Sequence, residues 1–138
     1  MKKIFIDCDV TIDFISVRDP YYENAADIFL PIQNKEYDGY ISSLSFSHIS
    51  YFLRKYVKFS ETISRMKDLR KLVKVCNVDS LVIDQSLDSK FSDFEDALQY
   101  HSALSVKADY IITRNAKDFK HSKIKVLSPK EFLSKLPQ

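Results

Sequence analysis

Cysteine is scarce in this sequence of 138 residues, which has two, Cys8 and Cys76. Two cysteines are too few for a disulfide framework, and their spacing is not that of a zinc site. We therefore expect a reducing compartment, for which the cytoplasm is the simplest choice. Glycine is rarer still, since Gly39 is the one copy. The sequence also lacks repeats, low-complexity tracts and linkers, so we expect one domain over residues 1–138.

Long hydrophobic runs are also missing. No apolar run approaches the roughly 18 residues that a membrane span needs. The apolar stretch near the N-terminus is interrupted by Asp7 and Asp9. A signal peptide needs a longer apolar core, so we expect neither export nor membrane insertion. The hydrophobic content of 45% is nevertheless ample for one buried core.

The net charge of +2 says little about partners by itself, but the distribution of charge is uneven. Between residues 51 and 75 the acids are Glu61 and Asp68, whereas the bases are Arg54, Lys55, Lys58, Arg65, Lys67, Arg70, Lys71 and Lys74. Such a segment suits a phosphate backbone. It equally suits two solvated helix faces, and the sequence leaves both interpretations open.

Short apolar runs alternate with segments of helical spacing along the chain. We expect strands over residues 3–6, 40–41, 75–78, 110–112 and 124–127. We expect helices over residues 10–15, 22–32, 43–56, 60–73, 81–87, 92–104 and 129–136. Strands separated by helices at these lengths indicate an α/β fold, with a parallel sheet of about five strands between helices. In such folds the ligand site lies beyond the carboxyl ends of the strands.

Residues that favour helix starts precede several of these segments. We expect Ser43 to cap one helix, Ser60 to begin the next, and Pro129 to occupy the first position of the last. Ser92 and Glu95 have the spacing of a capping box, with Asp93 favouring the same positive helix end. With these roles filled, Asp96 has no evident structural task.

Acidic and amide side chains follow the strands where a site is expected. Asp7 ends the first strand, with Asp9 just beyond it, and Asn115 and Asp118 follow the fourth strand. If the sheet is doubly wound, Asp7 and Asp96 lie close together at this edge, although Asp7 also suits a helix cap. Clustered carboxylates need a cation, and hard oxygen ligands suit Mg²⁺ or Mn²⁺. No serine or cysteine nucleophile with a paired base is evident, which favours water activated by the metal.

Three segments resemble the PIN-domain family, in particular its VapC-like toxin ribonucleases. They are FIDCDVTIDF, ISSLSFSHISYFL, and DFEDALQYHSAL followed by ADYIITRNAKDF. The resemblance implies a three-layer fold and cleavage of RNA phosphodiester bonds with Mg²⁺ or Mn²⁺. By motif, Asp7 matches the first acid of the family and Asp96 the third, while Thr113 and Asn115 match the threonine and the last site position. It also implies a small antitoxin partner.

Two positions depart from the family pattern. His48 stands where the family usually has glutamate, and neutral Asn115 replaces the last acid. Asn115 still offers a carbonyl oxygen. His48 can favour Mn²⁺, act as a general base, bind phosphate when protonated, or simply be a polar rim residue. The acids available to supply the missing charge are Asp9, Asp93, Glu95 and Asp118. A catalytically degenerate PIN fold that only binds a partner is therefore an alternative.

A phosphatase is a further alternative. Residues 7–11 (DCDVT) also fit the opening motif of haloacid-dehalogenase-like phosphatases, in which the first aspartate is the nucleophile. Ser42 or Ser43 fits the next element of that family. However, no well-placed lysine followed by a paired-aspartate loop is found downstream. That interpretation also leaves the segments around Asp96 and Asn115 unexplained.

Association with a second copy is the last expectation. The aromatic content of 13% leaves apolar surface to cover, and toxins of the family commonly pair. We therefore expect a homodimer, with residues 21–30 and 46–56 as its main contributors.

Overall fold

The computed structural model describes residues 1–137 and contains one parallel sheet in the order β3-β2-β1-β4-β5. The strands are β1 (Lys3–Ile6), β2 (Asp38–Ser42), β3 (Lys74–Cys76), β4 (Tyr110–Ile112) and β5 (Lys125–Leu127). The helices are α1 (Cys8–Ile15), α2 (Tyr22–Gln33), α3 (Ser43–Leu53), α4 (Phe59–Leu72), α5 (Ser80–Leu87), α6 (Phe94–Ser105) and α7 (Pro129–Ser134), with a 3₁₀ turn η1 (Ala116–Phe119). The α/β class and the five parallel strands confirm the prediction. Residue 138, part of the expected domain, lies outside the described residues.

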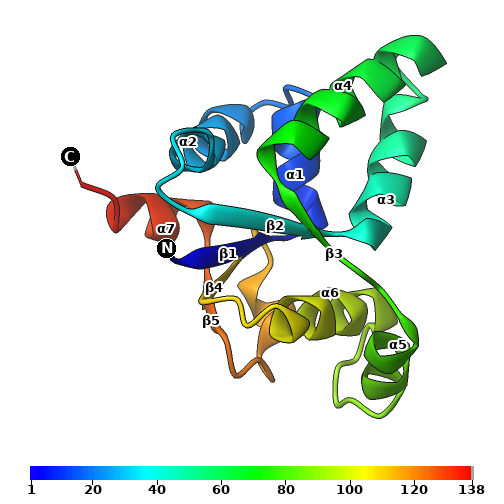
Figure 1. Ribbon diagram of the computed structural model, residues 1–138, viewed down its shortest axis with the longest axis vertical. Helices are drawn as coiled ribbons and strands as arrows, with labels where there is room; N and C mark the ends of the chain where they lie inside the picture. Colours follow the sequence, from blue (N-terminus) through cyan, green and yellow to red (C-terminus); the bar gives the residue numbers. More distant parts are fainter. Residues whose placement is uncertain (138) are drawn as a thin grey trace.

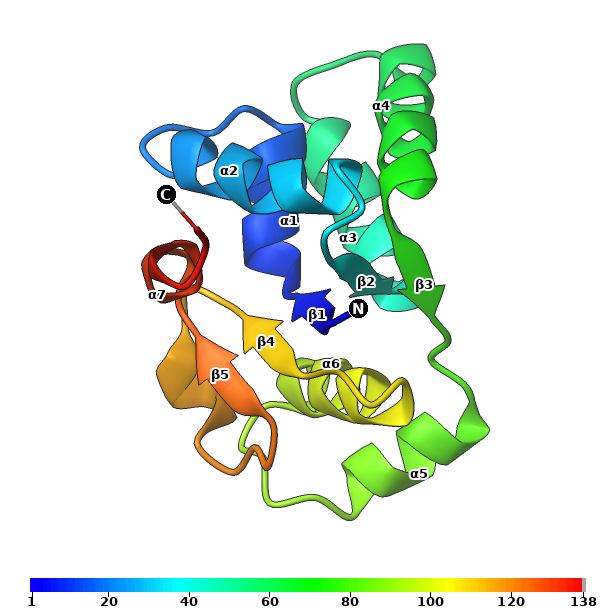
Figure 2. The ribbon, with the colours of Figure 1, turned by 60° about the vertical axis from the view of Figure 1, so that its left-hand side comes forward.

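Helices cover both faces of the sheet (Figures 1 and 2). Helices α1 to α4 lie over one face together with α7, and α5 and α6 lie over the other. The central strand β1 is buried on both sides, because Ile4 and Ile6 join the core beneath the first group while Phe5 joins the core around Tyr100 and Phe119. This alternation is the period-two pattern of a strand, and burial on both faces is typical of parallel sheets. No helix within residues 1–137 is long and apolar enough to cross a membrane.

The single glycine lies in β2 beneath α2. A Cβ atom added to Gly39 would lie 2.5 Å from Ile32 Cδ1. Glycine is therefore required by close packing of the helix on the strand, rather than by a turn conformation.

Two helix starts in the middle of the chain differ from the prediction. Ser42, not Ser43, caps α3, and its Oγ accepts a hydrogen bond from Ser45 N at 3.3 Å. Strand β2 runs to Ser42, so the chain turns directly from strand to helix at that residue. Helix α3 ends at Leu53, before the predicted end at residue 56, and α4 begins at Phe59 rather than Ser60.

The predicted capping box of α6 is wrong. Asp93 is the N-cap, and its Oδ1 accepts a hydrogen bond from Asp96 N at 3.1 Å. The helix therefore starts one residue later than a cap at Ser92 would require, and Glu95 faces His48 instead. At α7 the prediction holds, since Pro129 is in the first turn behind Ser128.

The order in which strands are added to the sheet changes side at β1. Strands β2 and β3 lie on one side of β1, and β4 and β5 lie on the other. Ile6 is in register with Ile112, and Asp7 N donates to Ile112 O at 2.9 Å. The residues that follow β1, β2 and β4 therefore meet at one edge, which is where doubly wound sheets bind ligands.

Candidate functional site

Asp7 is a buried carboxylate at this edge that three hydrogen-bond donors hold in place. It is 7% exposed. Its Oδ1 accepts hydrogen bonds from Cys8 N at 2.8 Å and Gln99 Nε2 at 3.0 Å, and its Oδ2 accepts from Thr113 Oγ1 at 2.8 Å. Asp7 is also the N-cap of α1, as its placement allowed. Since a carboxylate oxygen can accept more than one bond, Oδ2 keeps room for a further partner.

Two polar residues hold Asp7 in place, of which Gln99 was not predicted and Ser42 was named only for the phosphatase alternative. Gln99 and Ser42 are buried, and Ser42 Oγ donates a hydrogen bond to Gln99 Oε1. This bond fixes the amide so that its nitrogen faces Asp7. Two consecutive hydrogen bonds thus connect the end of β2 to α6, and α6 to the residue that follows β1. The available signal was a glutamine among the otherwise small and apolar buried positions of α6.

Asp9 lies beside the segment that follows β4. Its Oδ2 accepts from Asn115 Nδ2 at 3.0 Å and from Arg114 N at 3.2 Å. Burial, followed by the charge of Asp7, raises the pKa of Asp9 to about 6, while Arg114 opposes the rise. Because the Asn115 nitrogen faces Asp9, its amide oxygen is left for another partner.

A second buried acid, Asp13, holds the segment that follows β4 through Arg114. Asp13 is 1% exposed, and its carboxylate binds Arg18 Nη2 at 2.7 Å and Arg114 Nε at 2.8 Å. The guanidinium of Arg114 also lies 3.9 Å from the centroid of the Tyr21 ring. This arrangement holds Arg114, and with it the turn that carries Thr113. The sequence analysis missed this group, whose signal was an aspartate within an apolar helix.

Asp96 is half-buried in the first turn of α6. Burial, and after it the charges of Asp93, Asp7, Asp118 and Glu95, raises the pKa of Asp96 from 3.8 to about 7. Asp93 is already engaged as the cap, and Asp118 is exposed in η1. The predicted acids therefore act on one another electrostatically, which leaves excess negative charge at this edge.

The oxygen donors at this edge suit a hard cation. Within residues 1–137, no three His, Cys, Asp or Glu side chains form a ready metal-binding group. The available donors are Asp7 Oδ2, the Asp96 carboxylate and the Asn115 amide oxygen. Mg²⁺ commonly uses one or two protein carboxylates and keeps several waters, so this small set fits it. The raised pKa of Asp96 marks negative charge that a cation would balance.

His48 is placed beside Cys8 and Glu95 rather than beside Thr113. Its Nδ1 lies 3.7 Å from Cys8 Sγ, and its Nε2 lies 3.6 Å from Glu95 Oε1. Burial and Asp7 raise the pKa of the Cys8 thiol to about 12, so the thiol stays protonated at neutral pH. The donor and acceptor roles of the two ring nitrogens depend on the tautomer of His48.

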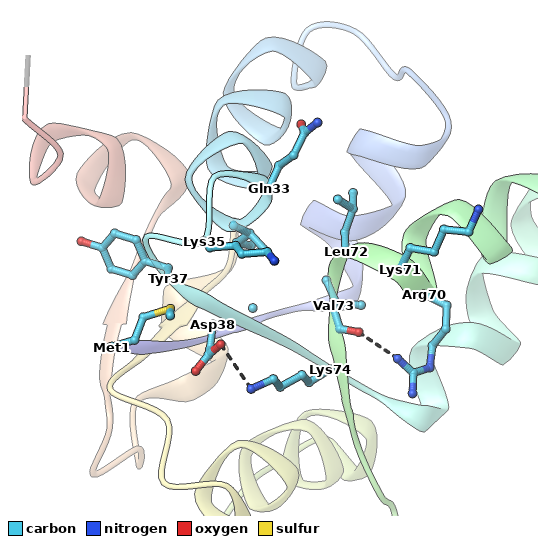
Figure 3. A pocket seen from close by; sticks show the side chains of 12 residues that line it. Met1, Gln33, Lys35, Tyr37, Asp38, Arg70, Lys71, Leu72, Val73 and Lys74 are labelled. Atoms are coloured by element: carbon cyan, nitrogen blue, oxygen red, sulfur yellow. Dashed lines mark hydrogen bonds and ion pairs between the residues drawn. The ribbon is translucent and has the colours of Figure 1, made fainter.

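Another cavity, of about 350 Å³, lies at the opposite edge of the sheet (Figure 3). Three of its cations, Arg70, Lys71 and Lys74, have partners within the chain. Arg70 Nη1 donates to Val73 O at 3.1 Å, and Lys74 Nζ pairs with Asp38 at 3.3 Å. Since this edge carries the amino ends of β2 and β3, we do not place the site there.

Comparison with known proteins connects this geometry to one family. The profile described as PIN domain matches residues 3–117, and no curated protein matches the sequence. A chain of DNA-bound VapBC from Salmonella typhimurium is 16% identical, with a TM-score of 0.69 over 94% of this chain and 99% of that one. A chain of VapBC2 from Rickettsia felis, bound to a promoter DNA fragment, is 17% identical, with a TM-score of 0.68 over 91% of this chain and 98% of that one. VapC20 from Mycobacterium tuberculosis, a sarcin-ricin loop cleaving toxin, is 14% identical, with a TM-score of 0.61 over 78% of this chain and 86% of that one. At these identities the likeness is one of fold.

Proposed function

This chain belongs to the PIN domain family, and we propose that it is a metal-dependent endoribonuclease, the toxin of a toxin–antitoxin pair. The observation that carries the proposal is the environment of Asp7. Three donors orient this buried carboxylate at the switch point of the sheet, and its charge acts on Asp96. An oriented acid beside a second acid of raised pKa is the arrangement that a divalent cation stabilises.

In this proposal Asp7, Asp96 and the Asn115 oxygen hold the cation. When bound, Mg²⁺ or Mn²⁺ activates water and stabilises charge on the scissile phosphate. Gln99 and Thr113 keep the Asp7 carboxylate in one orientation, so that little reorganisation is needed when the ligand arrives. Arg114, held by Asp13, keeps Thr113 and Asn115 in position.

The protein offers no better nucleophile than water at this site. The Cys8 thiol is protonated at neutral pH, and its sulfur lies 3.7 Å from His48 Nδ1. A haloacid-dehalogenase-like reaction would use Asp7 as the nucleophile, but the chain has no well-placed lysine followed by a paired-aspartate loop downstream. That interpretation also finds no counterpart in the PIN family match, so we do not propose it.

A degenerate PIN fold that only binds a partner is the second candidate. It is favoured by the lack of a ready three-ligand group within residues 1–137 and by the neutral residues His48 and Asn115. Glu95, beside His48, and Asp9, Asp93 and Asp118 are the acids that compensate for the lost charge in the enzymatic proposal. The missing carboxylate lowers the affinity for the cation, so we propose an enzyme of reduced Mg²⁺ affinity.

The proposed partners are an RNA substrate, a small antitoxin and a second copy of this chain. The structures of similar fold include VapBC complexes and a toxin–antitoxin complex from Klebsiella pneumoniae, which supports the antitoxin. Exposed apolar side chains in the segments named for the dimer, Leu30 at 53% and Tyr56 at 71%, support self-association. We further propose that residues 1–138 work as one cytoplasmic domain.

One set of assays separates the proposals. The native chain is incubated with RNA and with a generic phosphate monoester, each in Mg²⁺, Mn²⁺ or EDTA. We expect RNA cleavage in either metal, none in EDTA, and no release of phosphate from the monoester. Hydrolysis of the monoester alone would favour the phosphatase, and no reaction with either substrate would favour the binding module.

A further inference from the structure

Beside the candidate site, one face of α3 carries an exposed aromatic ring next to a cation. Ser47, His48, Tyr51 and Lys55 follow one another at steps of one, three and four residues, and all line a hollow of about 530 Å³. The Tyr51 side chain is 65% exposed. Lys55 Nζ lies 4.9 Å from the centre of its ring. The ring is thus largely exposed to the solvent, with the positive charge of Lys55 lying over it.

The hollow lies next to residues of the candidate metal site. Cys8, the residue after Asp7, lines it, and so does Glu95, whose charge acts on Asp96. A chain whose phosphate is held at Asp7 and Asp96 therefore has its neighbouring nucleotide within reach of α3.

The chemistry of the hollow suits a base better than a phosphate. The exposed ring of Tyr51 is a stacking surface for any nucleobase, and a base stacked on an aromatic side chain is a common device for holding single strands. The Glu95 carboxylate repels phosphate, but it can accept a hydrogen bond from the amino group of a base. Lys55, with Arg54 and Lys58 exposed nearby, supplies positive charge for the backbone on either side.

We propose that the surface formed by Ser47, His48 and Tyr51 of α3, with Lys55 in the turn that follows, is a nucleotide subsite, in which the base next to the scissile phosphate stacks on Tyr51 while Lys55 contacts the backbone. The proposal rests on the ribonuclease function proposed above. Such a subsite selects single-stranded over double-stranded RNA, because a paired base cannot reach the Tyr51 ring.

The test measures binding of a short fluorescein-labelled single-stranded RNA of mixed sequence, in EDTA so that no metal-dependent cleavage occurs. Tyr51→Ala should weaken the affinity about tenfold, whereas Tyr51→Phe should retain it, as expected for the loss of one stacked base. Phe59→Ala is the matched control, since Phe59 is 68% exposed, does not line this hollow and lies outside the segments proposed for self-association. Lys55→Gln should reduce the slope of log affinity against log salt by about 0.7, the value for one lost phosphate contact on a single strand.

Two further readouts separate the possible failures. Each variant is also tested for cleavage in Mn²⁺ and for its mass in solution by sedimentation. If the native chain cuts RNA but Tyr51→Ala binds the single strand as tightly as the native chain, the subsite is overturned and the ribonuclease proposal stands. If Tyr51→Ala instead turns a dimer into a monomer without changing RNA affinity, the ring belongs to a self-contact and the subsite is again overturned. If the native chain neither binds nor cuts RNA, the proposed function itself fails.

Discussion

Gln99 Nε2 donates a hydrogen bond of 3.0 Å to Asp7 Oδ1, and this bond joins α6 to the end of β1. Both side chains are buried, and the Gln99 oxygen is in turn bound by Ser42. The carboxylate that we propose as the main metal ligand is therefore oriented by the fold before any ligand binds. Its orientation depends on an amide that takes no part in the chemistry.

We expect Gln99→Met to lower both stability and activity. Ser42 and Asp7 each lose a buried partner, which costs about 1 to 3 kcal/mol for an unsatisfied group. Urea unfolding in EDTA measures the loss, and Gln85→Met on the exposed face of α5 is the control. A variant as stable as the native chain would show that the row of hydrogen bonds is not maintained in solution.

We expect Asp96→Asn to stabilise the metal-free protein at pH 8. The pKa of Asp96 is raised from 3.8 to about 7, so folding favours the protonated acid. Its ionised form opposes folding above about pH 7, and this cost disappears as the pH falls toward 4. For a half-buried group screened by solvent the gain at pH 8 is on the order of 1 kcal/mol.

The check on Asp96 is the unfolding free energy of both proteins in EDTA between pH 8 and pH 5. The advantage of the variant should shrink as the pH is lowered. A constant difference at every pH would mean that the Asp96 carboxylate is not under electrostatic strain.

We expect Arg114→Met to destabilise the fold by about 1 to 3 kcal/mol, because the buried Asp13 loses one of its two arginine partners. RNA cleavage should fall as well, since Arg114 fixes the turn that carries Thr113 and Asn115. Arg54→Met, at the exposed end of α3, is the matched control for stability. Loss of stability with full activity would separate Asp13 and Arg114 from the site.

We expect His48→Glu to increase Mg²⁺-dependent cleavage, because it returns a carboxylate to the position where the family usually has one. His121→Glu adds the same charge at an exposed position outside the site and should change nothing. The rate is measured against Mg²⁺ concentration for both variants. No gain for His48→Glu would mean that this position does not contribute to the cation site.

The strands were easier to predict from the sequence than the hydrogen bonds around Asp7. Strand β1 was predicted at its observed bounds, because a short apolar run that ends in aspartate has few other interpretations. The start of α6 was misplaced, because Ser92 and Asp93 are both good caps and local sequence does not choose between them. The structure chooses Asp93 and turns Glu95 toward His48.

The supporting residues of the site were missed for a different reason. Gln99 bonds to a residue 92 positions away, and Arg114 to one 101 positions away. Within its own helix each of Gln99 and Asp13 reads as an ordinary polar residue. Only the order of strands in the sheet brings these partners together, and one sequence does not contain that order explicitly.

The most direct test of the account is RNA cleavage by Asp7→Asn and Asp96→Asn in Mn²⁺, compared with the native chain and with Asp27→Asn on the exposed face of α2. Each substitution keeps the shape of the side chain but removes one negative charge from the proposed cation site. We predict that both site variants lose at least about a hundredfold in rate, consistent with losing a group that stabilises the transition state, while circular dichroism and the Asp27→Asn rate stay unchanged. Cleavage at the native rate by either site variant would contradict the account.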